Sequence, residues 1–263
     1  MDVVCYVAGH PDDALLFRGE VLYSDLHTPD ATVVHIVVSA GDAGRTDGWW
    51  QAREQAAVAA LRSTLSPDPV LEDTVVVSPQ LRSHGIRRYR APGFVCYCLR
   101  LPDGNVDGAG FPATQRRTLG KLQTGQVASL PAVDGSTAYQ GWSDLRDTLR
   151  ALIARERQGM ATLRPWVNTS DPSRALNPGD HPDHYATADA IDYFARADGL
   201  NRAWWVSYDT QQRAANLTGL GLLVKRMLFY SHGYDLQART GTPANDTEWD
   251  WWGAKSYART ETT

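Results

Sequence analysis

Two short segments of the chain combine histidine and aspartate around a proline, and each stands just before an expected helix. They are Gly9-His10-Pro11-Asp12-Asp13 and Asp180-His181-Pro182-Asp183-His184. Imidazole and carboxylate groups are good zinc ligands, and a catalytic zinc takes three protein ligands and keeps one position open. His10 and Asp13 can supply two of these ligands. Asp12 would then be left uncoordinated and available as a base.

Taken alone, the first segment is equally typical of a solvated turn in which an aspartate caps the following helix. The second segment favours a metal or catalytic site over a solvated turn, because His181 and His184 are three residues apart and face the same side of a helix start. Three of the seven histidines lie in the two segments. If both segments meet at one end of a sheet, they assemble His, Asp and His around one divalent metal ion.

The elements that must position these residues follow from hydrophobic periodicity. Apolar runs at 3–8 and 32–39 predict buried strands, and residues 13–23 and 49–65 predict helices. Strands joined by a helical crossover indicate βαβ units and a parallel sheet. Gly9 ends the first run, so the first motif lies at the carboxyl end of a strand, where open α/β sheets place their ligand sites.

The rest of the chain continues this pattern less regularly. Residues 101–140 are rich in Gly, Pro and Asp and are expected to form an extended loop region over the sheet. The other expected elements are strands or β-rich segments at 75–77, 82–101, 162–167 and 203–208, helices at 144–159, 185–197 and 211–230, and a polar, aromatic tail from 233 without a clear period. No repeat or linker is evident, so residues 1–263 are expected to form a single domain.

Composition and charge are those of a globular protein. Hydrophobic residues make up 43% and charged residues 21% of 263 residues, enough for one α/β domain with a sizeable core. The net charge of -4 argues against a nucleic-acid-binding face. No apolar run approaches the roughly 18–20 residues that span a membrane. The first residues also lack the basic region of a signal peptide.

The three cysteines are consistent with a reducing compartment, and a cytoplasmic location is expected. Cys96 and Cys98 are two residues apart and share one face of a strand. No second Cys or His pair with matching spacing joins them, so buried thiols are favoured over a metal site.

At the two histidine motifs the sequence resembles the PIG-L or LmbE-like zinc-dependent N-deacetylases. That family carries His-Pro-Asp-Asp after its first strand and His-x-x-His later in the chain. The resemblance extends to the turn at 39–44, the helix with Arg53-Glu54, the segment 101–104 and the stretch 225–232. It implies an α/β, Rossmann-like fold with a mostly parallel sheet, flanking helices and long loops over the carboxyl edge of the strands.

Carried over by position, the resemblance also implies roles for individual residues. His10, Asp13 and His184 would bind zinc, with another divalent metal such as Fe²⁺ as the alternative. Asp12 would be the general base. His181 would lie close to the metal and stabilise the oxyanion or donate a proton.

The sequence departs from the family pattern at two positions. Ala14 stands where members often have Glu, and Asp235 stands where Gln is common. A hydrogen-bonding partner of the metal site is therefore missing or supplied from elsewhere in the chain. The role of the segment around Asp235 stays open.

The resemblance implies that the substrate is an N-acetylated amino sugar or a conjugate of one, and leaves a homo-oligomer open. Trp49 and Trp50 follow a Gly-rich turn and are the tryptophans best placed to reach a pocket, although most tryptophans pack in cores. Arg53 is either a substrate clamp or part of a surface ion pair. Asp103 either accepts sugar hydroxyls or only stabilises its Pro-Asp-Gly turn.

Two functions of other classes also fit parts of the pattern. A non-haem iron oxygenase uses two His and one carboxylate, but it leaves Asp12 and His181 without a purpose and belongs mostly to β folds. A non-catalytic sugar-binding module would explain the fold, but not the presence of both Asp12 and His181. The sequence does not identify the sugar, its aglycone or the pathway.

Overall fold

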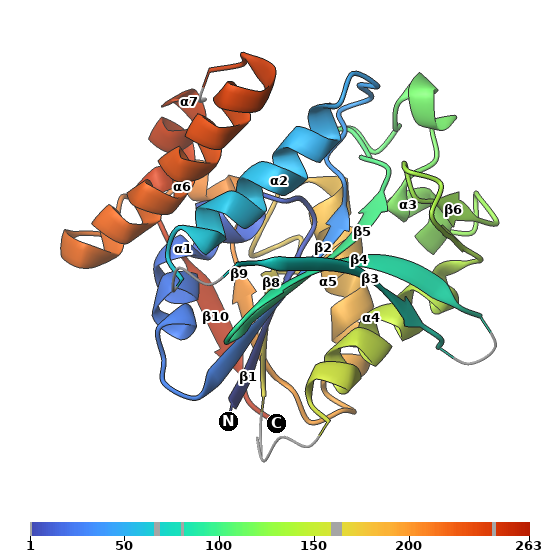
Figure 1. Cartoon of the computed structure of the whole chain (residues 1–263), viewed down its shortest axis with the longest axis horizontal. Helices are drawn as coiled ribbons and strands as arrows, with labels where there is room; N and C mark the ends of the chain where they lie inside the picture. The colour runs from blue at the N-terminus through green and yellow to red at the C-terminus, as the bar shows by residue number, and fades with distance from the viewer. Residues whose placement is uncertain (1, 66–68, 80–81, 159–164, 244–245) are drawn as a thin grey trace.

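The computed structural model describes residues 2–65, 69–79, 82–158, 165–243 and 246–263. Its centre is an eight-stranded sheet with the order β10-β9-β8-β1-β2-β5-β4-β3, and two further strands, β6 and β7, pair separately (Figure 1). The strands are β1 (Asp2–Ala8), β2 (Ala31–Ser39), β3 (Leu71–Val77), β4 (His84–Ala91), β5 (Phe94–Leu101), β6 (Leu130–Pro131), β7 (Ala138–Tyr139), β8 (Trp166–Ser170), β9 (Asn201–Trp205) and β10 (Ala258–Glu261).

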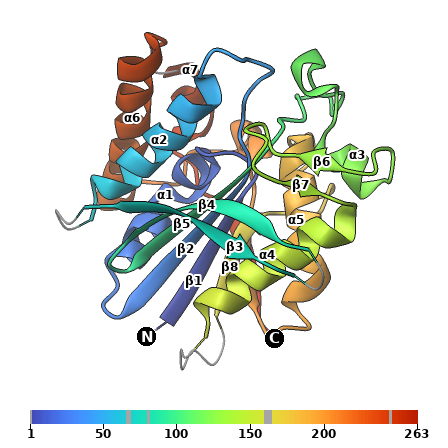
Figure 2. The same ribbon diagram turned by 45° about the vertical axis from the view of Figure 1, so that its right-hand side comes forward.

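Helices cover both faces of the sheet, and each layer has its own apolar core. One face packs against α1, α2 and α6, and the other against α3, α4 and α5 (Figures 1 and 2). Because both faces are covered, the central strands β1 and β2 are mostly apolar and buried over most of their length. The helices are α1 (Asp13–Leu26), α2 (Trp49–Arg62), α3 (Leu119–Gln123), α4 (Trp142–Glu156), α5 (Pro182–Ala195), α6 (Gly219–Thr240) and the short α7 (Asp246–Glu248).

The five strands in the middle of the sheet run parallel and create a crevice. From β1 the chain proceeds to β2 and later β5 on one side, and then to β8 and β9 on the other. The direction of winding therefore reverses between β1 and β8. The loops that leave the carboxyl ends of these two strands diverge, which is where doubly wound sheets bind ligands. The predicted Rossmann-like, mostly parallel α/β fold is confirmed.

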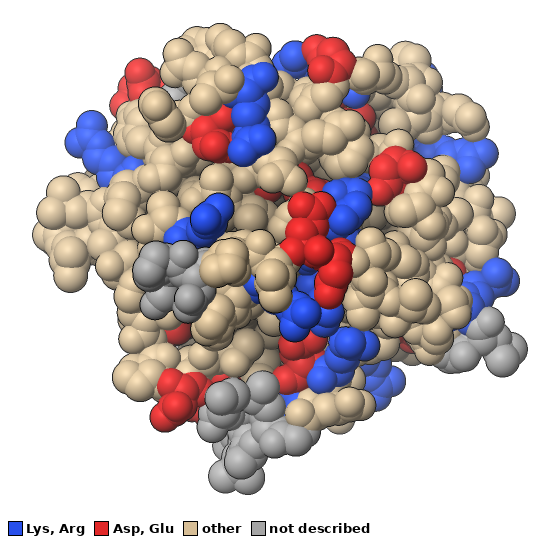
Figure 3. Space-filling view, in the orientation of Figure 1, with Lys and Arg blue, Asp and Glu red and all other residues tan. Residues whose placement is uncertain are grey.

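The predicted strand at 75–77 belongs to β3, but it does not continue the parallel pattern. β3, β4 and β5 pair antiparallel, and β3 forms the edge of the sheet. Pro92-Gly93, with Gly93 at φ +72°, reverses the chain within two residues between β4 and β5, and β3 then pairs antiparallel with β4. Figure 3 shows acidic and basic side chains side by side on this face, and ion pairs such as Arg88–Asp73 (2.6 Å) join β3 to β4.

The segment 101–140 is largely loop, as predicted, but it contains the short α3 and the β6–β7 pair. The tail is more regular than its sequence suggests, because α6 continues to Thr240 and β10 pairs antiparallel with β9. The predicted helix end at 159 and the predicted strand start at 162–164 lie outside the described residues. Across the described parts, no helix combines the length and apolarity needed to cross a bilayer.

Candidate metal centre

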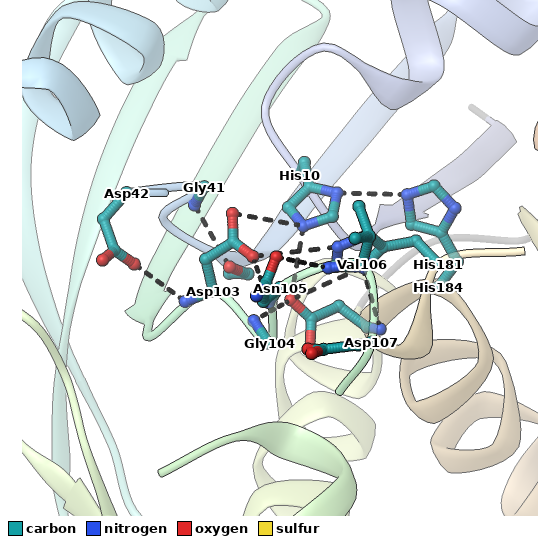
Figure 4. Close-up of polar contacts among 12 residues, drawn as sticks. His10, Gly41, Asp42, Asp103, Gly104, Asn105, Val106, Asp107, His181 and His184 are labelled. Atoms are coloured by element: carbon teal, nitrogen blue, oxygen red, sulfur yellow. Dashed lines mark hydrogen bonds and ion pairs between the residues drawn. The ribbon is translucent and has the colours of Figure 1, made fainter. Parts of the chain in front are cut away.

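The two histidine motifs meet at the carboxyl edge of the sheet, where β1 and β8 separate (Figure 4). His10 and Asp13 follow β1, and His184 lies in the first turn of α5. His10 Nδ1 is 3.1 Å from His184 Nε2, and Asp13 Oδ1 is 3.1 Å from His184 Nε2 and 3.7 Å from His10 Nδ1. All three side chains are buried. Three potential ligand atoms thus converge on one point.

These separations fit a divalent metal ion. In a tetrahedral site with bonds of 2.0–2.1 Å, neighbouring ligand atoms are about 3.3–3.4 Å apart. The observed distances lie on both sides of this value, and two imidazoles with one carboxylate suit zinc or ferrous iron. A ring nitrogen of His181 also lies within 4.8 Å of ring nitrogens of His10 and His184. The geometry therefore allows a second set of metal ligands, made of these three histidines.

Each of the two histidines nearest Asp13 has a carboxylate behind it. Asp183 Oδ2 lies 3.3 Å from His10 Nε2, and Asp180 Oδ1 lies 2.8 Å from His184 Nδ1. Such carboxylates orient the ring, select its tautomer and make the opposite nitrogen a stronger ligand. Ala14 is buried in the core. Ala14 cannot act as a hydrogen-bonding partner of the site. Asp180 and Asp183, both in the second histidine motif, take that place for His184 and His10.

Glycine at two positions lets these groups approach one another. A Cβ atom at Gly9 would lie 2.7 Å from the His184 ring, and one at Gly104 would lie 2.6 Å from Asp183 Oδ1. Gly104 N–H donates to Asp183 Oδ2 at 2.8 Å. The Pro-Asp-Gly turn therefore helps to orient the carboxylate behind His10.

The electrostatics of the cluster favour positive charge. Burial alone would lower the pKa of His10, but hydrogen bonds with Asp13 and Asp183 and the charges of Asp13 and Asp103 outweigh it and raise that pKa to about 10. Burial would likewise raise the pKa of Asp13, but His184 and His10 hold it well below its ordinary value. A site that stabilises cationic groups so strongly is also suited to a metal cation.

Asp12 lines the same cavity as His10 and Asp13 but has a different partner. Its Oδ1 accepts a hydrogen bond from Arg53 Nη2 at 2.5 Å, and Arg53 Nη1 donates to Gly41 O at 2.8 Å. Gly41 has φ +58°, and a Cβ there would lie 2.8 Å from Arg53 Cζ, so glycine gives the guanidinium its path. Burial would raise the pKa of Asp12, but the Arg53 charge lowers it. Asp12 is thus an ionised carboxylate beside the ligand cluster.

His181 caps α5 and also faces the cluster. Its Nδ1 accepts a hydrogen bond from the Asp183 N–H at 3.1 Å, so the proton of the neutral ring is on Nε2. Nε2 lies 3.8 Å from Asp103 Oδ1. Burial and the neighbouring His10 lower the pKa of His181 to about 4. The ring is therefore a neutral donor at Nε2.

A cavity of about 550 Å³ opens onto the cluster. Of the residues that the sequence singled out for substrate binding, Trp49, Arg53 and Asp103 line it, while Trp50 lines a neighbouring hollow. The wall from the N-terminal half includes Leu16, Phe17, Arg45, Asn105, Val106 and Phe111, and the wall from the C-terminal part includes Tyr208, Phe229, His232, Leu236 and Trp252.

Sequence reasoning did not single out Tyr208, Phe229, His232 or Leu236 of the C-terminal wall. Tyr208 stacks on Trp252 with ring centroids 4.8 Å apart, and the Tyr208 ring is 5.3 Å from that of His184. Phe229 and His232 come from α6. The stretch 225–232 belongs to the family resemblance. Residues 225, 229 and 232 are separated by four and three positions, and this spacing could have marked one face of a helix. Nothing in the sequence linked that face to the metal ligands.

Comparisons with known proteins show the fold. No family model and no curated protein sequence matches the chain. Among solved structures, the antimicrobial reagent A40926 pseudoaglycone deacetylase Dbv21 is similar with a TM-score of 0.50 at 16% identity, covering 98% of this chain and 94% of that one. The chain shares the fold of Dbv21.

Two further solved structures are similar over most of their length. N,N'-diacetylchitobiose deacetylase from Pyrococcus horikoshii has a TM-score of 0.46 at 14% identity, covering 99% of this chain and 84% of that one. The 4-carboxy-2-hydroxymuconate hydratase GalB from Pseudomonas putida has a TM-score of 0.43 at 12% identity, covering 95% and 82%. A shared fold does not by itself establish a function, which must be argued from the site.

Proposed function

We propose that this chain is a metal-dependent hydrolase of the PIG-L/LmbE type that removes an N-acyl group, most simply N-acetyl, from an amino sugar or its conjugate. One observation carries the proposal. Ligand atoms of His10, Asp13 and His184 lie 3.1–3.7 Å apart, with the separately paired carboxylate of Asp12 next in sequence. Metal-assisted amide hydrolysis needs a set of metal ligands and, beside it, a base that does not itself bind the metal.

Each polar group then has a task in that reaction. His10, Asp13 and His184 would hold a divalent cation, which would supply Lewis acidity to an acyl oxygen and to a nearby water molecule. Asp12 takes the proton as water attacks the acyl carbon, and returns it to the nitrogen as the carbon–nitrogen bond breaks. His181 Nε2–H donates a hydrogen bond to the acyl oxygen as that oxygen gains negative charge.

The walls of the cavity support an amino-sugar substrate. Trp49 offers an aromatic face for a sugar ring, and Asp103 offers a carboxylate for hydroxyl groups. Arg53 acts mainly through Asp12, because its 2.5 Å ion pair holds the base in place. The similarity in fold to Dbv21, a pseudoaglycone deacetylase, over nearly the whole of both chains is consistent with a deacetylase.

The metal and the location are finer parts of the same proposal. Zinc is proposed as the metal because a two-nitrogen, one-oxygen ligand set with an open position is typical of catalytic zinc. A cytoplasmic location is proposed because the free thiols of Cys5, Cys96 and Cys98 suit a reducing compartment.

A mass-spectrometric screen tests the proposal directly. Purified protein loaded with zinc is incubated with a panel of N-acyl amino sugars, and loss of the acyl mass is measured together with acetate release. His10→Ala, Asp13→Ala and His184→Ala should each lose both bound metal and acyl release. Stoichiometric zinc in any one variant would remove that residue from the ligand set. No acyl release from the panel by zinc- or iron-loaded wild type would refute the proposed reaction.

A further inference from the structure

A second hollow borders the cavity at the metal centre and has no part in the proposed mechanism. Its volume is about 440 Å³, against about 550 Å³ for the cavity. Both volumes lie in the range of about 300–1,000 Å³ that is usual for ligand pockets. The two spaces share four wall residues, which are Val106, Tyr208, Glu248 and Trp252. A ligand that outgrows the cavity on this side therefore enters the hollow.

The hollow also borders the second histidine motif. Pro178 and Gly179 line it and are followed directly by Asp180, the carboxylate behind His184. A group bound in the hollow is thus next to the segment that carries a metal ligand. This position suits a part of the substrate attached to the sugar that reacts at the metal.

The tryptophans of the turn Trp249–Gly253 have different surroundings. Trp249 packs against Phe229, with ring centroids 5.4 Å apart, and the buried Trp252 stacks on Tyr208 at 4.8 Å. Trp251 meets only the edge of the Trp252 ring, at 5.4 Å, and is 40% exposed. It lines the hollow but not the cavity. Core packing therefore accounts for Trp249 and Trp252, whereas Trp251 offers an accessible aromatic surface.

One lysine fixes two parts of the wall of the hollow relative to each other. Lys255 Nζ donates to the backbone carbonyl of Trp251 at 2.8 Å and to that of Gln211 at 2.9 Å. Trp252 Nε1 also donates to Tyr208 O at 3.3 Å. The wall is therefore held in place before a ligand arrives, which reduces the entropy cost of binding.

The polar groups of the hollow suit hydroxyl groups better than anions. Gln211 and Gln212 are exposed amides, and each can both donate and accept hydrogen bonds. Asp209 and Glu248 add carboxylates, which accept hydrogen bonds. Among the described residues that line the hollow there is no Lys or Arg. A phosphate or carboxylate group would therefore meet acidic neighbours without a cation.

We propose that the hollow binds a second sugar ring of the substrate, with one face of that ring on Trp251 and its hydroxyl groups on Gln211 and Gln212. The C–H face of a pyranose ring is apolar and covers an aromatic ring, while the hydroxyl groups at its edge need donors and acceptors. This rests on the proposed function and deepens it, because the substrate becomes an N-acylated amino sugar joined to another sugar.

The test compares one-ring and two-ring substrates in variants of Trp251. The substrates are N-acetylglucosamine and a set of its disaccharides that differ in linkage. In the wild type, at least one disaccharide should have a kcat/KM about 3–10-fold above that of N-acetylglucosamine, the gain expected from one aromatic contact. Trp251→Ala should lose this gain and keep the value for N-acetylglucosamine. Trp251→Phe should retain most of the gain.

Tyr234→Ala is the matched control, because it removes an exposed ring on α6 that lies in neither wall as described. It should leave the preference for the disaccharide unchanged. Equal kcat/KM for N-acetylglucosamine and every disaccharide in the wild type would overturn the proposal. A gain that survives in Trp251→Ala would also overturn it.

Two further substrates identify other occupants of the hollow. An aryl glycoside of N-acetylglucosamine can stack on Trp251 but brings no further hydroxyl groups. If its gain exceeds that of every disaccharide and persists in Gln211→Ala and Gln212→Ala, the hollow binds an aromatic aglycone and not a sugar. A glucosamine with a long N-acyl chain is the other probe. If Trp251→Ala lowers kcat/KM for this substrate and for no disaccharide, the hollow binds the acyl chain.

A binding measurement separates this proposal from the proposed function. Calorimetry with glucosamine and its disaccharides needs no turnover. Tighter binding of a disaccharide by the wild type, lost in Trp251→Ala, supports the second sugar site even if no acyl group is released, and then only the proposed function fails. Equal affinity of the wild type for glucosamine and every disaccharide would reject the site. Melting temperatures identify a loss caused by misfolding, and a folded Trp251→Phe variant keeps the test decisive.

Discussion

Adjacent carboxylates in one tight turn differ in role because their partners differ. Asp13 lies among imidazoles, with His184 Nε2 at 3.1 Å, whereas Asp12 pairs with Arg53 at 2.5 Å. In the proposed roles, the first arrangement offers an oxygen to a metal ion, and the second pairs an ionised oxygen with a guanidinium group. The side chains alone do not distinguish these roles, but their contacts do.

Asp12→Asn should keep its metal and lose about 10²–10⁴-fold in kcat, because an amide of the same shape does not accept the proton of the attacking water. Metal content and kcat are measured on one preparation. Near-normal turnover in Asp12→Asn would place the base elsewhere.

His181→Ala should also keep its metal and lose turnover, since its Nε2–H acts on the acyl oxygen.

Asp180→Asn and Asp183→Asn should each weaken metal binding about 10–100-fold, because each removes the carboxylate behind a ligand histidine. Competition with a zinc-sensitive chelator dye measures the affinity. Asp198→Asn, which disrupts only a surface ion pair with Arg150, is the matched control. An affinity equal to that of the control would show that the two carboxylates do not support the ligands.

At the scale of elements, α6 and the turn that follows it act as one wall of the site. Lys225 is fully buried on α6, and its Nζ donates to the backbone carbonyls of Trp252 (3.4 Å) and Lys255. These bonds hold the turn at Trp249–Gly253 against the helix. Trp252 can then stack on Tyr208 in the cavity wall.

The buried Lys225 should leave a signature in the pH dependence of stability. Burial lowers its pKa to about 8 from a model-peptide value of 10.5. Between these pH values the folded state has released the proton and the unfolded state still holds it, so this group makes stability rise with pH. The free energy of unfolding of the wild type relative to Lys225→Met should therefore increase from pH 8 to 10.5. Urea unfolding across this range measures it, and a flat or falling difference would contradict it.

At the scale of the whole molecule, a metal ion would tie together segments more than 170 residues apart in sequence. The loop after β1 and the start of α5 come from opposite sides of the switch point between β1 and β8. A ligand that binds only the folded state stabilises it in proportion to the logarithm of its concentration.

Zinc should therefore raise the melting temperature of the chelator-treated protein. At a zinc concentration of 100 times Kd the gain is about 2.7 kcal/mol, which corresponds to roughly 5–10 °C for a domain of this size. Differential scanning calorimetry with and without zinc measures the shift. His184→Ala should show no shift, and an equal shift in that variant would mean that zinc stabilises the fold from another site.

The sequence by itself determined the alternation of strands and helices, the position of the first motif after a strand, and the candidate ligands. Each depends on patterns within a few residues, such as the apolar runs of β1 and β2 and the three-residue spacing of His181 and His184. The expectation that residues 1–263 form one domain stays a prediction. The antiparallel pairing of β3 and the continuation of α6 to Thr240 already depended on neighbours.

Only the tertiary structure decided which groups share the site. Asp180 and Asp183 became partners of the ligand histidines, and His232 and Trp252 became parts of the cavity wall. None of these roles follows from local spacing. Each depends on which helix packs on which face of the sheet, and that is set by burial of apolar surface summed over the whole chain. A local apolar pattern shows which face of an element is buried, but this non-directional force does not show which partner covers it.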